Sequence, residues 1–325
     1  MHRAPTRCGA ADPPCIHSDP LAPYSKHRRY NSPVCRSLAM DGESLDLAKA
    51  IGNCATSLGF DMELEGDQGP VAHLRAMGAC NRRLCPFCEW RRSKAWRRRF
   101  FQGLPQFHED FPTHKPLFLT LTVRNCALGE LKETLAHMHA SWHRMTRCAF
   151  FPTKFWFRRT EITQQGGEIP GSVGVHVHPH IHALLFVPSG YFSHGYVRQT
   201  EWQQQWQMAA RLDYAPVVDV RRARTRASTP AEPLAESRVA ALEVAKYATK
   251  ATDLLSMGSA LGEFNRQVKG MRLSASSRSL RPYISDAAIA NDELVDNGTV
   301  AIAPTVRAQA LWFEDVGEYL FSAVT

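Results

Sequence analysis

Regular patterns of apolar and polar residues cover most of the chain between residues 113 and 283. Segments rich in β-branched and aromatic residues predict strands over residues 116–124, 154–163, 173–187 and 215–220. Segments with apolar residues at helical spacing predict helices over residues 128–148, 199–211 and 234–255. A glycine-rich turn at residues 164–171 joins the second and third strands as a hairpin. The pattern therefore predicts an α+β fold with a central, largely antiparallel sheet flanked by helices.

The rest of the chain is less regular. Residues 1–40 are rich in Pro, Arg, Ser and Ala without any period, which predicts a disordered tail. Residues 41–112 predict a separate Cys- and Arg-rich module that contains a very basic helix over residues 86–101. Residues 284–325 predict an acidic C-terminal tail with one amphipathic patch. The domain that carries the sheet is therefore expected at residues 113–283.

Charge and composition narrow the class of partner. The formal net charge of +8 on 325 residues favours a polyanionic partner, of which nucleic acid is the commonest. The chain has no apolar run of about eighteen residues that would span a membrane, and its first residues lack the apolar core of a secretory signal. We therefore expect a cytoplasmic protein with reduced thiols. In that compartment nine cysteines point to metal binding rather than to disulfides.

Four histidines at every second position form the sharpest local feature, in the segment His176-Val-His178-Pro-His180-Ile-His182. A strand has a side-chain period of two, so all four imidazoles project from one face. Histidines two apart on a strand can converge on one metal ion through neutral imidazole nitrogens. The alternative is an exposed histidine face without any ligand role. Because apolar residues follow directly from Ala183, the pattern favours a metal site among these four histidines, His178 included, over an exposed histidine face.

Two imidazoles make a weak metal site, so a third ligand is expected. Glu161 lies on the strand before the hairpin, and neighbouring strands are only about 5 Å apart. A carboxylate buried there without a partner would be costly. Glu161 is therefore the best candidate for the third ligand, and the alternative is an exposed glutamate at the edge of a strand.

A tyrosine on a predicted helix is the candidate nucleophile. Glu243 precedes Tyr247 by four residues and Lys250 follows it by three, so a helix would place all three side chains on one face. The positive charge of Lys250 would stabilise the phenolate, which can attack phosphorus, and Glu243 could act as a general base. By itself this pattern is also typical of an ordinary amphipathic surface helix. It becomes specific only together with the histidine strand.

Clustered cysteines predict a structural zinc site. Cys85 and Cys88 form a CxxC pair, and Cys80 precedes the pair by five residues. Thiolates at this spacing suit tetrahedral Zn²⁺. Cys54 is the natural fourth ligand, His73 is its rival, and the alternative to a metal site is a set of free thiols.

Basic residues surround the cysteine cluster, and tryptophans are interleaved with them. The candidate DNA contacts are Arg82, Arg83, Arg91, Arg92, Lys94, Arg97, Arg98 and Arg99. A run of charges is usually only a solvated face. In a basic protein with a predicted zinc module, however, such a run favours contacts to phosphate, and Trp90 or Trp96 could stack on unpaired bases.

Read in order, these motifs resemble the one-tyrosine HUH endonucleases, and within them the rolling-circle replication initiators (Rep proteins) of small bacterial plasmids. The segment from Phe118 to Asn125 is similar to the first motif of the family. The histidine strand is similar to the second motif, and the stretch from Glu243 through Tyr247 to Lys250 is similar to the third. The cysteine cluster and the segment Lys269-Gly-Met-Arg272 also resemble this plasmid group. The resemblance covers about residues 54–283.

The resemblance implies an HUH-like sheet and a metal-dependent endonuclease. His180 and His182 would hold Mg²⁺ or Mn²⁺, with Glu161 as the third ligand by analogy with other HUH enzymes. Tyr247 would attack one strand of the origin DNA, which leaves a 5′-phosphotyrosine and a free 3′-OH. A host helicase and polymerase would then act on that DNA, and a homodimer is compatible with the sequence. Because the third motif offers one tyrosine, water activated by Glu243 would make the terminating cut.

Other interpretations stay open. A histidine-triad nucleotide hydrolase would use His178, His180 and His182, but it leaves Tyr247 and the cysteines unexplained. A transposase of the HUH type would share the chemistry and differ in the element that it moves. A zinc-dependent DNA-binding regulator would need no catalysis at all. A conjugative relaxase is disfavoured because its tyrosine normally precedes the histidines. A two-tyrosine initiator is disfavoured because the positions four residues before and after Tyr247 are Glu243 and Ala251, and neither is a tyrosine.

Overall fold

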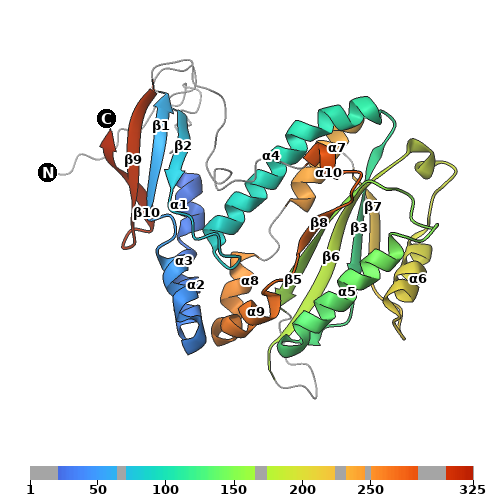
Figure 1. The fold of residues 1–325 in the computed structure, drawn as a ribbon, viewed down its shortest axis with the longest axis horizontal. Helices are drawn as coiled ribbons and strands as arrows, with labels where there is room; N and C mark the ends of the chain where they lie inside the picture. Colours follow the sequence, from blue (N-terminus) through green and yellow to red (C-terminus); the bar gives the residue numbers. More distant parts are fainter. Residues whose placement is uncertain are drawn as a thin grey trace, which may run out of the picture. The chain divides into compact units, whose positions relative to one another are not determined.

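The fold was examined in a computed structural model, which describes residues 21–63, 71–164, 174–223, 232–245, 250–284 and 305–324. The chain divides into two compact units, and each is described by itself. Unit 1 contains residues 1–29, 55–78 and 295–325, and unit 2 contains residues 30–54 and 79–294. Both units are therefore assembled from segments that are far apart in the sequence, as the colours in Figure 1 show.

Unit 1 is built on an antiparallel sheet in the order β10-β9-β1-β2. Its strands are β1 (Ser57–Glu63), β2 (Val71–Met77), β9 (Thr305–Phe313) and β10 (Glu318–Val324). Helix α1 (Ala22–Arg28) packs on one face, where the ring of Tyr24 lies 5.3 Å from that of Phe60. Phe60 is fully buried, as expected for a residue between a helix and the centre of a sheet.

The structure corrects the expectation that both ends of the chain are tails. From Ala22 onward the N-terminal segment is helical, and residues 305–324 form the β9–β10 hairpin that pairs with β1. The physical reason is alternation: Ala308, Ala310 and Tyr319 are buried on the helix-covered face of the sheet. The segment 41–112 is also not one module, because residues 55–78 belong to unit 1. Residues 1–20 and 285–304 lie outside the described residues.

Unit 2 contains the antiparallel sheet that the sequence predicts, in the order β7-β3-β6-β5-β8, with β4 also paired to β6. Its strands are β3 (Lys115–Thr122), β4 (Cys126–Ala127), β5 (Trp156–Gln164), β6 (His176–Val187), β7 (Val218–Arg222) and β8 (Ser274–Ser276). The expected strands correspond to β3, β5, β6 and β7, so the α+β class is confirmed. The expected hairpin is confirmed by the antiparallel pairing of β5 with β6.

The helices of unit 2 surround this sheet and the cysteine cluster. They are α2 (Asn31–Ala39), α3 (Leu45–Gly52), α4 (Pro86–Asp110), α5 (Leu131–Met145), α6 (Gln199–Ala210), α7 (Pro233–Val244), α8 (Ala251–Ser256), α9 (Leu261–Val268) and α10 (Arg281–Ile284). Short 3₁₀ helices lie at η1 (Gly42–Ser44), η2 (Leu128–Glu130), η3 (Ser189–Phe192) and η4 (Gly258–Ala260). Within the described residues, no helix is long and apolar enough to cross a membrane.

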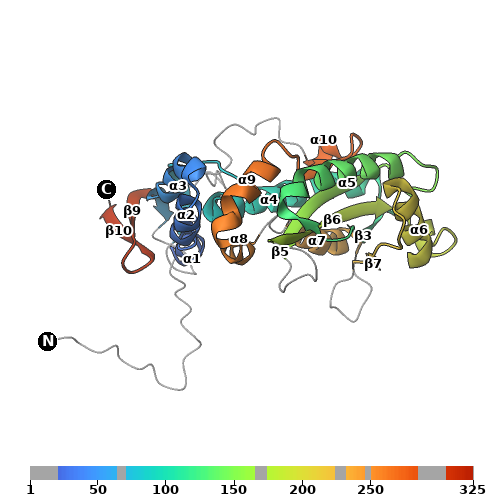
Figure 2. The ribbon, with the colours of Figure 1, turned by 90° about the horizontal axis from the view of Figure 1, so that it is seen from below.

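Helices cover both faces of the unit 2 sheet. On one face α5 and α6 bury Trp142, Trp202 and Trp206 against apolar residues of β3 and β6. On the other face α4, α7 and α10 pack through side chains such as Phe107 against Phe186 and its neighbours. Figures 1 and 2 show the sheet strands between these two groups of helices. The sheet is thus the middle layer of an α/β/α arrangement.

The face of the sheet that meets α4 and α7 changes from apolar to polar along β6. Leu184 and Phe186 lie fully buried in the core on this face. His182 and His180 follow on the same face at the period of two, and both remain half-buried. The apolar end anchors the strand in the core, so the polar end holds its imidazoles at fixed positions.

The predicted helix over residues 234–255 is two helices in the structure. Helix α7 ends at Val244, and α8 begins at Ala251 after Lys250, whose backbone is extended with ψ 148°. No glycine or proline lies between Val244 and Ala251, so the sequence has no local signal for the interruption. Lys250 therefore does not continue the helix that carries Glu243.

Candidate functional site

The pairing of three strands gathers the polar residues of the candidate site. Glu161 on β5 lies directly opposite His180 on β6. Thr120 on β3 lies directly opposite His182. Because directly opposite residues in an antiparallel pair have Cβ atoms about 5 Å apart, this register brings all four side chains together.

Glu161, His180 and His182 form a group that can hold a divalent metal ion. Their ligand atoms all lie within 4.8 Å of one another. Glu161 Oε2 is 2.9 Å from Nε2 of His182 and 3.2 Å from Nε2 of His180. The donor set is two imidazole nitrogens and one carboxylate oxygen, which leaves positions open for water or substrate on a bound ion.

The outer nitrogens of both imidazoles have acceptors. His182 Nδ1 lies 3.2 Å from the hydroxyl of Thr120, and His180 Nδ1 lies 3.2 Å from the carbonyl oxygen of His178. With Nδ1 beside its acceptor, each Nε2 faces Glu161 Oε2, to which a protonated Nε2 donates a hydrogen bond and beside which a deprotonated Nε2 can bind a cation. Such partners fix the tautomer and the ring orientation of metal-binding histidines in proteins.

Charge around Glu161 also fits a cation site. Burial raises the pKa of Glu161, but the hydrogen bonds from His180 and His182 outweigh burial and hold that pKa well below its ordinary value. Lys250 Nζ lies 3.5 Å from the second carboxylate oxygen, Oε1. Oε2 therefore faces the two imidazoles as an ionised ligand, and Oε1 faces Lys250.

His178 lies outside this group of three. Its Nδ1 is 2.5 Å from Oδ1 of Asn125, the last residue of the segment that begins at Phe118. Burial, together with the charge of His180, lowers the pKa of His178 and favours its neutral form. Its ring centroid is 5.4 Å from that of His180, so it borders the group.

A cavity of about 180 Å³ lies beside this group of three residues. Its lining includes Glu161, His182, Glu243 and Lys250. The structure thus brings two of the three residues of the predicted tyrosine motif to the candidate metal centre, although they belong to different helical segments. The third, Tyr247, lies outside the described residues.

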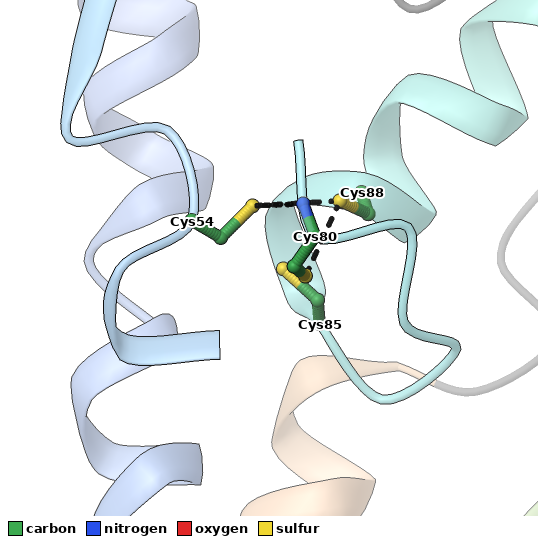
Figure 3. A group of neighbouring side chains, drawn as sticks. All are labelled: Cys54, Cys80, Cys85 and Cys88. Atoms are coloured by element: carbon green, nitrogen blue, oxygen red, sulfur yellow. Dashed lines mark hydrogen bonds between the residues drawn. The ribbon is translucent and has the colours of Figure 1, made fainter. Parts of the chain in front are cut away.

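The four cysteines Cys54, Cys80, Cys85 and Cys88 form a second group, with thiol sulfurs within 4.8 Å of one another. Cys54 follows α3, whereas Cys85 and Cys88 lie at the start of α4, as Figure 3 shows. Cys88 Sγ is 3.5 Å from Cys54 Sγ and 3.7 Å from Cys80 Sγ. Four converging thiols match the donor set of a closed structural zinc site.

Mutual hydrogen bonds and burial shift the pKa values of the four thiols in opposite directions, lower for Cys80 and Cys88 and higher for Cys54 and Cys85. Hydrogen bonds from the thiols of Cys54, Cys85 and Cys88 lower the pKa of Cys80 below its ordinary value. Asn31 on α2 accepts from the Cys85 thiol and from the backbone N–H of Phe87. The N-terminal segment thereby holds the first turn of α4 in place. Cys54 completes the group of four, and the side chain of its rival, His73, lies outside the described side chains.

The structure divides the basic residues of α4 and its preceding loop into two sets. Arg91 and Arg99 are buried, with 3% and 7% exposure, and Arg99 stacks on the ring of Trp96. Exposed or half-buried side chains make up the other set: Arg82, Arg83, Arg92, Lys94, Arg97 and Arg98. The expectation that the whole run faces DNA is therefore corrected for Arg91 and Arg99, because one face of the helix packs inward.

Sequence reasoning did not find the ion pair that joins α4 to β5. Glu89 follows Cys88, is 7% exposed, and pairs with the guanidinium of Arg159, which is 4% exposed. The Nη1 of Arg159 also donates to the carbonyl oxygen of Ala245, 3.4 Å away, just after α7. Arg159 stands two residues before Glu161 on the same face of β5. The pair therefore links the cysteine group, the candidate metal centre and the end of α7.

Breaking this pair on one side is expected to destabilise unit 2. Arg159→Met leaves the carboxylate of Glu89 buried with less compensation, so we expect a loss of about 3–5 kcal/mol in the free energy of unfolding. The double variant Glu89→Leu/Arg159→Met removes both charges and should lose less than Arg159→Met alone. Urea denaturation of the three proteins measures both values. A loss below about 1 kcal/mol for Arg159→Met, the size of an exposed pair, would contradict this role.

Comparison with known proteins identifies relatives over most of the chain. The family model Rep_1, described as Replication protein, matches residues 71–305. A "Protein rep" of Bacillus amyloliquefaciens is 33% identical over 222 residues, which cover 64% of this chain and 61% of that protein. A "Protein rep" of Lentilactobacillus hilgardii is 34% identical over 215 residues, covering 64% and 63%. A "Replication protein" of Staphylococcus aureus is 33% identical over 150 residues, covering 45% and 60%.

These matches span about three fifths of the length of the relatives. No solved structure matches the chain. The matched residues include the histidine strand, Glu161, three of the four clustered cysteines and the residues from Glu243 to Lys250, whereas Cys54 precedes them.

Proposed function

The chain belongs to the Rep_1 family of replication proteins, and on that premise we propose that it initiates rolling-circle replication of a plasmid. It would do so as an HUH endonuclease that nicks one strand of the origin. The observation that carries this proposal is the group of Glu161, His180 and His182 beside a cavity lined by Glu243 and Lys250. A family of replication proteins favours this function over the alternative of an HUH-type transposase.

The chemistry is a transesterification at phosphorus. His180 and His182 would bind Mg²⁺ or Mn²⁺ through Nε2, and Glu161 through Oε2. When bound there, the ion supplies positive charge that neutralises the scissile phosphate. The phenolic oxygen of Tyr247 forms a bond to phosphorus as the bond from phosphorus to the 3′ oxygen breaks. The phenolic proton passes to solvent, and the departing 3′ oxygen takes up a proton to become a 3′-OH.

Lys250 and Glu243 have separate roles in this proposal. The positive charge of Lys250 would stabilise the phenolate of Tyr247 while Lys250 stays paired with Glu161 Oε1. At the terminating cut, the oxygen of water would form a bond to phosphorus as the bond to the 3′ oxygen breaks. Glu243 would accept the proton of the water, and the departing 3′ oxygen would take up a proton to become a 3′-OH. That second reaction leaves no new phosphotyrosine, so replication ends after one round.

A nicking assay tests the proposed function. Single-stranded DNA tiled from the replicon that encodes the chain would be incubated with the protein and Mn²⁺, or with no divalent ion, and run on a denaturing gel. We expect a Mn²⁺-dependent cut at one site, a covalent protein–DNA adduct and a free 3′-OH. Binding without a cut on any tile would favour a zinc-dependent DNA-binding regulator instead.

Removing a proposed metal ligand is expected to lower nicking more than removing Thr120, whose hydroxyl supports His182. Glu161→Ala and His182→Ala each remove a donor, and we expect nicking to fall more than about 100-fold with loss of Mn²⁺ binding. Thr120→Val removes only the acceptor for His182 Nδ1, and such outer partners are worth about 10–100-fold in metal affinity. Mn²⁺ titrations of the nicking rate measure both effects. His194→Ala, an exposed histidine, is the matched control and should behave like the unmodified chain.

We propose further that Cys54, Cys80, Cys85 and Cys88 hold one structural Zn²⁺. Support comes from four thiol sulfurs within 4.8 Å, which fill a tetrahedral site and leave no position for substrate, and from the burial of Cys54, Cys85 and Cys88. The zinc site would hold the adjoining loop and α4 in place, so that their basic residues can contact the origin DNA.

The proposed function also requires a host helicase and a host polymerase, because the free 3′-OH must be extended on an unwound template.

A further inference from the structure

A basic pocket lies next to the candidate metal centre and is not used by the proposed reaction. It encloses about 340 Å³, which is within the usual size range of ligand pockets. Arginines from three parts of unit 2 line it, namely Arg83, Arg92, Arg159 and Arg272, together with Glu89 and Trp96. Four guanidinium groups thus share one carboxylate.

The carboxylate of Glu89 already pairs with two of these arginines. Glu89 pairs with Arg159 through Oε1, and its Oε2 lies 3.1 Å from Nη1 of Arg92. Arg92 is also committed to the cysteine loop, because its Nη2 donates to the carbonyl oxygen of Asn81 at 2.5 Å. Two of the four guanidinium groups therefore have their partners within the protein.

Arg83 and Arg272 have no such partner. Among the described residues, neither forms an ion pair with a carboxylate, and the Nη1 of Arg83 is buried without a hydrogen bond. Four guanidinium groups beside the single carboxylate of Glu89 leave the pocket with an excess of positive charge, so an anion bound between Arg83 and Arg272 would stabilise it.

The backbone holds both arginines in place. Arg83 lies in the loop between Cys80 and Cys85, which the cysteine group closes. Arg272 follows Gly270, whose φ of +78° makes the turn after α9, and the next carbonyl, that of Leu273, accepts from the N–H of Thr160 at 2.7 Å. This is the segment Lys269-Gly-Met-Arg272, for which the proposed reaction has no use.

The pocket adjoins the site of the proposed nick. Arg159 lines this pocket and also the cavity that contains Glu161 and His182. Guanidinium groups match phosphate oxygens in geometry and charge. Resting on the proposed function, we infer that Arg83 and Arg272 bind one backbone phosphate of the DNA strand, close to the phosphate that is cut.

Salt-dependent binding of single-stranded DNA tests this inference without any need for the reaction. All proteins would carry Tyr247→Phe, retain their zinc and receive no Mg²⁺ or Mn²⁺, and the probe would be a labelled oligothymidylate of about 20 nucleotides. Removing one contact to phosphate should reduce the slope of log K against log salt by about 0.7. We expect this reduction, with roughly tenfold weaker binding at low salt, for Arg83→Gln and for Arg272→Gln.

If both arginines hold the same phosphate, their effects should not add. The double variant Arg83→Gln/Arg272→Gln should show nearly the same slope as either single variant. Arg147→Gln removes the same charge from an exposed residue outside the pocket and should leave the slope unchanged. Arg272 is exposed, so Arg272→Gln keeps the test valid if Arg83→Gln fails to fold.

The inference is overturned if Arg272→Gln keeps the full slope, or if Arg147→Gln lowers it as much. It is also overturned if inorganic phosphate, compared with chloride at equal ionic strength, raises the melting temperature as much as the oligonucleotide does, since the pocket would then be a site for free anions. If the slopes fall as expected but the chain with Tyr247 does not nick DNA, the phosphate site is supported and the proposed endonuclease activity is not. If that chain nicks DNA but the slopes of the arginine variants do not change, the endonuclease activity is supported and the phosphate site is not.

Discussion

Tyr247→Phe is expected to abolish the covalent protein–DNA adduct and to lower the nicking rate by more than about three orders of magnitude. The variant removes one oxygen atom, and this atom is the proposed nucleophile toward phosphorus. Neither Glu243 nor Lys250 can replace it in forming a phosphotyrosine. The adduct is measured by denaturing gel electrophoresis with labelled single-stranded DNA that spans the mapped nick.

The matched control for this prediction is Tyr196→Phe. Tyr196 is 59% exposed and does not line the cavity beside Glu161. It should therefore keep both nicking and adduct formation. An adduct that persists in Tyr247→Phe and disappears in another tyrosine variant would assign the nucleophile elsewhere. DNA binding by Tyr247→Phe should stay close to that of the unmodified chain, because the chemistry is lost and the binding surface is not.

Loss of the metal that we propose for the cysteine group is expected to have the largest effect on stability. The four thiols join the segment after α3 to the first turn of α4, so Cys85→Ala opens a group that closes a long loop of the chain. Apparent binding free energies of structural Zn²⁺ reach about 10–16 kcal/mol in small zinc domains, and they form part of the folding free energy. We therefore expect Cys85→Ala, or removal of zinc by a strong chelator, to unfold this part of unit 2.

Metal analysis and thermal unfolding measure this prediction. The purified chain should contain about one Zn²⁺ bound to four ligands, the usual coordination of such sites. Cys148→Ala removes an exposed thiol outside the group and serves as the control, which should keep both its zinc and its melting temperature. A chain isolated without zinc, in which Cys85→Ala is as stable as Cys148→Ala, would show that the cysteines form a set of packed thiols.

Stability and nicking are expected to be linked through the Glu89–Arg159 pair. Glu89 follows a cysteine of the proposed zinc site, and Arg159 stands two residues before a proposed metal ligand. If the first turn of α4 became disordered, Arg159 would lose its ion pair with Glu89 and would no longer be held in position beside the candidate metal centre. This link couples the two groups within one unit, although 70 residues separate Glu89 from Arg159 along the chain.

What the sequence by itself determined were the features that depend on neighbouring residues. The period of two from His178 to His182 is confirmed as a strand face, because side-chain direction in a strand follows from the backbone alone. The spacing of Cys80, Cys85 and Cys88 likewise predicts converging thiols, since a turn and the first turn of a helix bring them together. The strands of the central sheet and the helices that flank it were likewise predicted from the periodicity of apolar residues within each segment.

Only the tertiary structure decided what depends on distant pairing. The register of β5 on β6 places Glu161 opposite His180, and the packing of α4 selects which arginines are buried. The C-terminal residues join this sheet because β9 pairs with β1, from the opposite end of the chain, and their alternation does not reveal that partner. The interruption between α7 and α8 has no glycine or proline to mark it. In each case the energy comes from burial and hydrogen bonds between segments that the sequence keeps far apart, so periodicity within one segment carries no information about it.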